Sequence, residues 1–167
     1  DDGVSIKAYD VVGVGPAPCS NVTIRRTNVV SRNICVGAAT EGGVSDILFE
    51  DVSVGDPDTV TSPWAIKFKV STGHLRNITF RRLQIGRIGD TPWMYPNNAP
   101  GDAFHVDIRP PANATRSPPT IEGLTFEDIS VVAVTSVGHI SGPPTGVQNL
   151  TLRNITVQSA GNGWGGC

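Results

Sequence analysis

Two adjacent carboxylates and a pair of lysines are the residues of this sequence whose types and spacing suit chemistry. Asp1 and Asp2 open the stretch DDGVSIKA, and Lys67 and Lys69 alternate with apolar residues in AIKFK. Neighbouring acids on a strand point in different directions, and their mutual repulsion helps to keep one of them protonated, so that one donates a proton and the other accepts one. An Asp-Asp-Gly turn without chemistry and a pair of solvated lysines are the alternatives.

A nine-residue repeat predicts the elements that position these side chains. The copies begin 25, 31, 46 and 26 residues apart, at Asn21, Asp46, Asn77, Gly123 and Asn149, within or near the period of solenoid repeats. The second and fourth residues of each copy are apolar, and the seventh and ninth mostly are. Burying both pairs requires a bend at the two polar residues between them. Each copy is therefore predicted to form two strands around a corner.

The charges at the predicted corner alternate from copy to copy. The fifth residues are Arg25, Glu50, Arg81, Glu127 and Arg153, and the sixth are Arg26, Asp51, Arg82, Asp128 and Asn154. Stacked strands lie about 4.8 Å apart, so this order places opposite charges side by side and favours the register. The order also indicates that the 46-residue interval is one coil with a long excursion in the Pro-rich segments TPWMYPNNAPGD and RPPANATRSPP.

A second set of strands is predicted between the copies, at VSIKA, ICVGA, AIKFK, AFHVDI and VGHIS. If Val4, Ile34, Ile66 and Phe104 face inward, two rows of side chains face outward. The first row holds Ser5, Cys35, Lys67 and His105, and the second holds Lys7, Gly37, Lys69 and Asp107. The sequence thus predicts an all-β parallel β-helix, a solenoid of about five coils. A β-sandwich of short strands is the alternative.

Composition bounds the remaining possibilities. A chain of 167 residues with 38% hydrophobic and 17% charged residues is typical of one globular domain, here residues 1–167. A formal net charge of -2 argues against a nucleic-acid partner, and the apolar runs are too short to span a membrane. The three cysteines, Cys19, Cys35 and Cys167, fit neither a complete disulfide framework nor a paired metal site. The chain starts without methionine or signal peptide, and we expect it to be part of a longer protein.

In their order, these segments resemble the polygalacturonase family of glycoside hydrolases. DDGVSIKA looks like the family's paired-aspartate motif, and GGVSDILFEDVSV looks like the coil that follows its histidine motif. AIKFKVSTGHLRNITF resembles the segment with its Arg-Ile-Lys motif, and AFHVDI and GLTFEDISV continue in step. The resemblance implies a right-handed parallel β-helix, of which this chain would be the C-terminal half of the catalytic domain. It also implies hydrolysis of α-galacturonosyl linkages in pectin.

Carried over residue by residue, the resemblance assigns roles to four side chains. Asp1 matches the general acid, and Asp2 matches one of two carboxylates that activate water. Inversion at the sugar carbon requires roughly 6.5–9.5 Å between acid and base. Lys67 and Lys69 match the arginine and lysine that hold a galacturonate carboxylate, although lysine at position 67 replaces a bidentate fork by a point charge.

The sequence also departs from the family. The Gly-His-Gly motif aligns with Ser31, Arg32 and Asn33, so the histidine is absent. Arg32 stands near its place, either to contact a substrate carboxylate or in a structural role. The family's third aspartate would lie before residue 1. Gly3 stands where many members have a cysteine, which leaves Cys19 without that partner.

Several further residues carry weaker predictions. His105 lies beyond Lys67 on the outward row and either reaches a ligand or is an ordinary surface histidine. Trp64 immediately precedes the Lys67 strand and is favoured over Trp93 and Tyr95 for stacking on a sugar ring. Five Asn-x-Thr sequons are present, but four lie inside the repeat, where they have a structural explanation. Asn113, in a Pro-rich segment, is therefore the predicted glycosylation site.

Three functions remain open at the level of sequence. The first is a secreted, extracellular or cell-wall polygalacturonase-type hydrolase, a monomer when full length, with a pectic polysaccharide as partner and no cofactor. The second is a catalytically inactive β-helix that binds carbohydrate or serves a structural role. The third is a related glycosidase that acts on another acidic or rhamnose-containing polysaccharide. We expect the 167 residues alone to be inactive and prone to aggregation, because an uncapped coil exposes a strand edge.

Overall fold

The computed structural model is built from parallel strands, and it describes residues 2–11, 13–89, 101–109 and 118–162. No helix occurs among these residues, so none of them belongs to a helix that could cross a membrane. The strands are β1 (Val4–Ile6), β2 (Asp10–Val11), β3 (Gly15–Pro16), β4 (Cys19–Val29), β5 (Ile34–Gly37), β6 (Val44–Val54), β7 (Val60–Ser62), β8 (Trp64–Val70), β9 (His74–Ile88), β10 (Asp102–Ile108), β11 (Thr120–Ser141) and β12 (Val147–Asn162).

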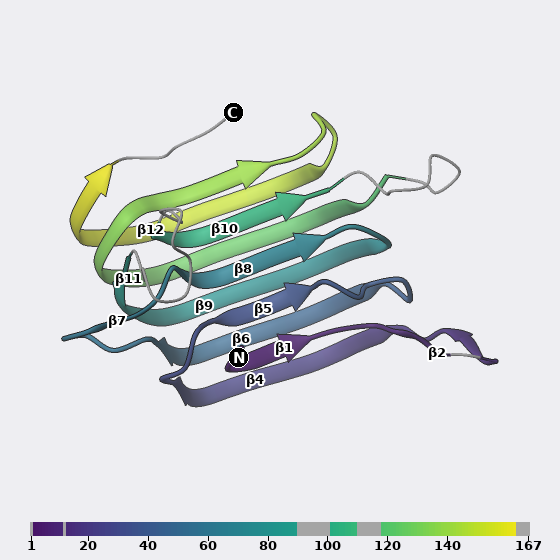
Figure 1. The fold of residues 1–167 in the computed structure, drawn as a ribbon, viewed down its shortest axis with the longest axis horizontal. Helices are drawn as coiled ribbons and strands as arrows, with labels where there is room; N and C mark the ends of the chain where they lie inside the picture. Colours follow the sequence, from purple (N-terminus) through teal and green to yellow (C-terminus); the bar gives the residue numbers. More distant parts are fainter. Residues whose placement is uncertain (1, 12, 90–100, 110–117, 163–167) are drawn as a thin grey trace.

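The strands stack in two columns, which Figure 1 shows from the purple N-terminal end to the yellow C-terminal end. The first column consists of β1, β5, β8, β10 and the last residues of β11. The second column consists of β4, β6, β9, the first part of β11, and β12. Every pairing within the columns is parallel, whereas β2 and β3 form a small antiparallel pair. This is the architecture of a parallel β-solenoid, not of a β-sandwich.

The register predicted from the repeat is confirmed. In the second column Ile47 pairs with Val22 on one side and Ile78 on the other, and Leu124 lies between Ile78 and Leu150. In the first column the predicted inward residues are paired, in the order Val4, Ile34, Ile66 and Phe104. VGHIS joins the column with Gly138 opposite Phe104.

The two copies of the repeat that begin 46 residues apart, at Asn77 and Gly123, lie on neighbouring strands of the second column. β9 and β11 pair directly, while β10, which lies between them in sequence, pairs with β8 and β11 in the first column. The prediction that no further coil lies between these two copies is thus confirmed for the described strands. Most of the two Pro-rich segments falls in residues 90–100 and 110–117, outside the described residues.

The chain bends at two positions of each copy. The sixth residue has a positive φ in all five copies, which agrees with the predicted bend at the fifth and sixth residues, and Arg26 and Arg82 adopt it at 52° and 53°. The first residue has a positive φ as well, which the sequence argument did not predict. Asn, Asp and Gly tolerate this conformation best, and they occupy the first position in every copy: Asn21, Asp46, Asn77, Gly123 and Asn149.

Both columns bury their inward side chains in one core. Phe49, Phe80 and Phe126 occupy the fourth position of successive copies and stack with centroid separations of 4.9 and 5.2 Å. Phe104 of the first column packs against Phe126 at 4.4 Å, and Phe68 meets Phe80 edge-on at 5.9 Å. These five rings are at most 2% exposed. The aromatic stack therefore joins the columns and holds the outward rows in place.

Candidate functional site

The outward side chains of the first column form two rows, which together we call the first-column face. The first row contains Ser5, Cys35, Lys67, His105 and His139. The second contains Gly37, Lys69, Asp107 and Ser141. Neighbours in a row lie about one strand spacing, 4.8 Å, apart. The predicted rows are confirmed, except that Lys7 follows the last residue of β1 and has no assigned pair.

Lys67 lies over an aromatic ring. Its Nζ is 3.4 Å from the centroid of the Trp64 ring, a cation–π contact. Burial lowers the pKa of Lys67 from its ordinary value, while the neighbouring Cys35 and Asp2 act in the opposite direction. Trp64 is only 8% exposed, so the ring predicted to stack on a sugar lies beneath the lysine instead of at the surface.

Lys69 lies in the second row between Gly37 and Asp107. A side chain at position 37 would clash with the backbone, because a Cβ there would lie 2.0 Å from the Lys69 carbonyl oxygen. The φ of 116° at Gly37 also disfavours any other residue. Asp107 accepts hydrogen bonds from Arg109 Nε at 2.7 Å and Ser141 Oγ at 3.3 Å, so the second row is polar and partly neutralised.

His105 is held by a buried carboxylate. Its Nδ1 lies 2.7 Å from Oδ2 of Asp102, which has no exposed surface. Its ring stacks on His139 with a centroid separation of 5.3 Å and meets Trp64 at 5.4 Å. His105 was predicted from the sequence as a candidate ligand contact, whereas Asp102 was not. The predicted register could have pointed to Asp102, because it pairs this residue, at the start of β10, with Trp64.

Asp2 lies just before β1 and contacts Ser5, the first residue of the first row. It is exposed, and its Oδ2 accepts a hydrogen bond of 2.9 Å from Ser5 Oγ. Burial, followed by the charge of Asp2, raises the pKa of the Cys35 thiol to about 11. The negative charge of Asp2 therefore affects the pKa values of two residues in the first row, Cys35 and Lys67. Five residues singled out from the sequence lie outside the described residues: Asp1, Trp93, Tyr95, Asn113 and Cys167.

Arg32 precedes β5 in the segment that aligns with the family's histidine motif. It is half-buried and forms no ion pair with another described residue. Counting back two residues from the pair Ile34 and Ile66 places Arg32 in line with Trp64. Both alternatives for Arg32, a substrate contact and a structural role, remain compatible with this position.

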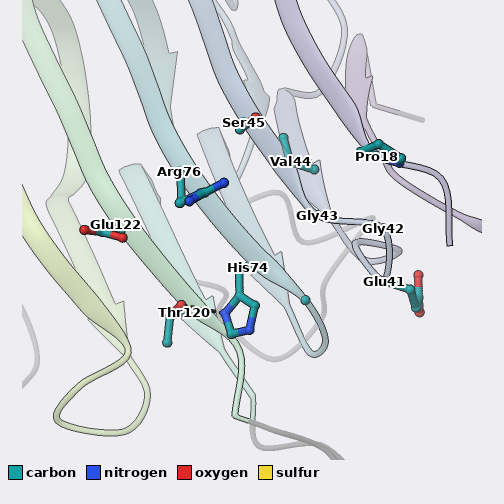
Figure 2. Close-up of a pocket in the computed structure, with 11 residues that line it drawn as sticks. Pro18, Glu41, Gly42, Gly43, Val44, Ser45, His74, Arg76, Thr120 and Glu122 are labelled. Atoms are coloured by element: carbon teal, nitrogen blue, oxygen red, sulfur yellow. Dashed lines mark hydrogen bonds between the residues drawn. The ribbon is translucent and has the colours of Figure 1, made fainter.

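A groove of about 550 Å³, which the sequence did not predict, lies at the start of the second-column strands (Figure 2). Ser45, Arg76 and Glu122 share one row of its wall. His74 points toward Thr120, with its Nδ1 2.9 Å from the hydroxyl oxygen. The charges of this groove are mixed, with Arg76 between Ser45 and Glu122, and this makes it a weaker candidate than the first-column face.

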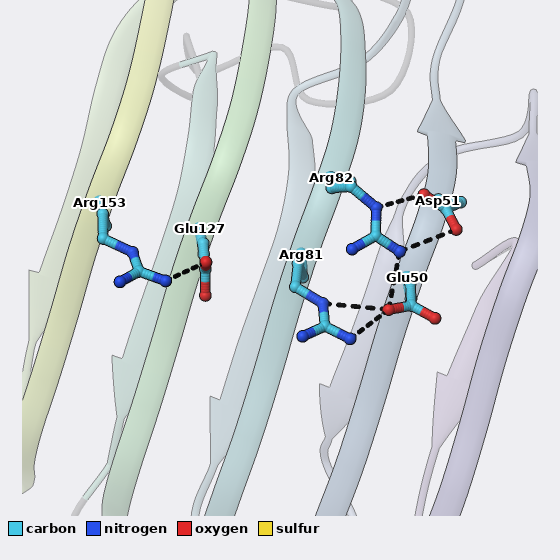
Figure 3. Close-up of polar contacts among 6 residues, drawn as sticks. All are labelled: Glu50, Asp51, Arg81, Arg82, Glu127 and Arg153. Atoms are coloured by element: carbon cyan, nitrogen blue, oxygen red, sulfur yellow. Dashed lines mark hydrogen bonds and ion pairs between the residues drawn. The ribbon is translucent and has the colours of Figure 1, made fainter.

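A second groove, of about 530 Å³, runs along the corner of the repeat, where the predicted charge alternation is confirmed (Figure 3). Arg82 binds Asp51 at 2.7 and 3.1 Å and Glu50 at 2.8 Å, and Arg81 also pairs with Glu50. One step further on, Arg153 pairs with Glu127, and Asn154 donates to Asp128 at 2.8 Å. Because these groups satisfy one another, the corner serves register more than ligand binding.

Comparison with known proteins identifies no family whose sequence pattern matches this chain and no curated protein that is similar to it. The chemistry of the first-column face is therefore argued from its own side chains. The face combines a carboxylate, two ammonium groups, one of them over a buried tryptophan ring, and an imidazole held by a buried acid. Such a set suits a ligand that carries both hydroxyl groups and negative charge.

Proposed function

We propose that this protein is a glycoside hydrolase of the polygalacturonase type, which hydrolyses α-galacturonosyl linkages in pectin with inversion. The proposal is carried by one observation: Lys67 and Lys69 project from the first-column face, and Asp2 accepts a hydrogen bond from Ser5 at the β1 end of that face. A polyuronate presents a carboxylate on every sugar, and two outward lysines next to a carboxylate suit such a polymer. We also propose that the solenoid is right-handed and has about five coils.

In the proposed reaction, two carboxyl groups act on opposite sides of the scissile bond. Asp1 donates a proton to the glycosidic oxygen as that bond breaks. Asp2, together with the carboxylate that the family resemblance places before residue 1, takes a proton from water as its oxygen attacks the sugar carbon. Lys67 and Lys69 bind the carboxylate of a neighbouring unit. Partial burial strengthens the attraction of Lys67 for that anion, because less water screens the charge.

The polymer substrate implies secretion to the extracellular space or cell wall, and we propose that the complete enzyme acts there as a monomer. Asn113 is its proposed glycosylation site. A second candidate is a catalytically inactive binding module. It is favoured by the replacement of the family's histidine motif with Ser31, Arg32 and Asn33. A module of this kind retains polygalacturonate without releasing reducing ends.

The assay that tests the proposal measures reducing ends released from polygalacturonate by the complete enzyme, which includes the carboxylate expected before residue 1. Asp2→Asn is expected to lower kcat by about 10²–10⁴, the range of general acid–base contributions. Asp58→Asn, which changes an exposed acid outside the first-column face, is the matched control and should leave the rate unchanged. Lys69→Ala is expected to raise KM more than it lowers kcat.

The outcomes separate the candidates. Equal rates for wild type and Asp2→Asn, or products that retain the anomeric configuration by NMR, would contradict the proposed mechanism. Wild-type protein that binds polygalacturonate in a lysine-dependent way but releases no reducing ends is the result expected of the binding module. Protein that binds no polygalacturonate refutes both.

A further inference from the structure

The proposed reaction leaves unused a cluster at the β10 end of the first-column face. Asp102, His105 and His139 form it, and Trp64 borders it. The Asp102 side chain is 1% exposed and that of His105 is 15% exposed. A fully buried acid beneath a partly exposed imidazole is costly to maintain, and it needs a reason beyond packing.

The buried acid determines which nitrogen of His105 carries hydrogen. An ionised carboxylate accepts hydrogen bonds and cannot donate them. With Asp102 as a carboxylate, the contact of 2.7 Å between its Oδ2 and His105 Nδ1 has the N–H of Nδ1 as donor. Oδ1 of Asp102 has no hydrogen-bond partner among the described residues. Nδ1 of His105 is therefore the main hydrogen-bond donor to the Asp102 carboxylate. In the neutral ring, Nε2 is then left as an acceptor.

The surroundings of His105 suit a sugar. The rings of Trp64 and His139 lie against the imidazole at centroid distances of 5.4 and 5.3 Å and restrict its rotation. Lys67 is the neighbour of His105 in the first row, one strand spacing away, and its ammonium group lies over Trp64. A hydrogen-bond acceptor and a cation thus come from neighbouring strands and both lie against the Trp64 ring. A sugar unit with a hydroxyl group and a carboxylate matches this pair.

We propose that His105, positioned by Asp102 and His139, accepts a hydrogen bond from a hydroxyl group of the uronate unit whose carboxylate binds Lys67. His105 is a binding residue in this subsite, while Asp102 and His139 are positioning residues. The identity of the sugar rests on the proposed function. The imidazole supplies selectivity for hydroxyl position, which the two lysines cannot provide as point charges.

Substitutions at position 105 separate binding from structure. His105→Asn keeps an amide N–H near the position of Nδ1, where it can donate to Asp102, but removes the hydrogen-bond acceptor Nε2. His105→Gln places its amide near Nε2 instead. Asparagine is expected to weaken the binding of galacturonate oligomers of defined length by about threefold to tenfold, the value of one hydrogen bond. Glutamine should restore part of the loss. His74→Asn, at a histidine outside the first-column face, is the matched control and should bind as wild type.

Titration of the oligomers by calorimetry, with Lys67→Ala alongside, distinguishes the two proposals. If His105→Asn binds as tightly as wild type while Lys67→Ala binds more weakly, the subsite inference is wrong and the proposed function stands. If wild type binds no oligomer, the proposed function fails, and this inference fails with it.

A spectroscopic measurement on wild type keeps the inference testable if the variants do not fold. The ¹⁵N resonance of His105 Nε2 should shift when the oligomer is added, while that of His74 should not. An unchanged Nε2 resonance at saturating oligomer overturns the inference.

Discussion

Alkylation of Cys35 measures how well water is excluded from the first row. The thiol is 6% exposed, and burial together with the charge of Asp2 raises its pKa to about 11. Only the thiolate reacts with iodoacetamide. At pH 8 its fraction is roughly 10⁻³ in the folded protein, against roughly 0.2 for an unperturbed thiol with a pKa near 8.5. Alkylation should therefore be about 200-fold slower than in the unfolded chain, before any steric protection.

Mass spectrometry of the Cys35 peptide over time, in buffer and in concentrated urea, gives both rates. Cys19, which is half-buried, provides an internal comparison in the same digest. The native rate should rise about tenfold for each pH unit up to about pH 10, because the thiolate fraction does. A native rate at pH 8 within a few-fold of the rate in urea would refute the argument that the row is desolvated at this position.

The same shift links stability to pH. The pKa of Cys35 is higher in the folded protein than in the unfolded chain. Its contribution to the free energy of unfolding is therefore fully present below about pH 8.5 and is lost as the pH rises through 11. A shift of about two units corresponds to a loss on the order of 2–3 kcal/mol. Urea unfolding at pH 8 and pH 10.5 should show this loss in wild type and a smaller one in Cys35→Ala. Equal losses in both proteins would assign the effect to other groups.

Two further predictions concern the solenoid. Phe80→Ala removes the central ring of the aromatic stack and should lower the free energy of unfolding by about 3–5 kcal/mol in urea titrations, a value that a change below 1 kcal/mol would contradict. Hydrogen bonds from Arg81 and Arg82 lower the pKa of Glu50. The ionised Glu50 therefore adds to the free energy of unfolding above about pH 4.3, and this stabilisation is lost as the pH falls through the lowered pKa of the folded state. Glu50→Gln should therefore show a shallower loss of stability below pH 4 in acid titration than wild type does, and parallel curves would count against the pairing.

The register of the fold was predictable because burial leaves little choice. A slip of one residue in the second column would expose Phe49 and Phe80 and bury Glu50 beside Arg81. Inward and outward residues can therefore be assigned by alternation alone, and the charges at the corner support the same register. The same alternation predicts Lys67 and His105 in one row, as the structure has them.

The contacts within the first-column face were not predictable in this way. Alternation assigns Asp102 and Trp64 to the inward set of their strands, yet both meet outward side chains, the imidazole of His105 and the ammonium of Lys67. Such contacts depend on rotamers at strand ends, which a periodic pattern does not encode. The bend at the first residue of each copy was missed because the preference of Asn77 or Asp46 for positive φ is a weak local bias. The roles of Asp1 and Asn113 stay predictions.

The unequal spacing of the repeat has a consequence for how such a protein can diversify. Copies lie between 25 and 46 residues apart, yet their strands pair in one register. The pairing of the strands therefore does not depend on the length of the chain segments that connect them. The extra length enters on either side of β10, after Ile88 and after Ile108. Insertions there can be gained or lost without moving Lys67 or His105. The connections can therefore vary while the stacked strands keep the outward rows of the first column in place.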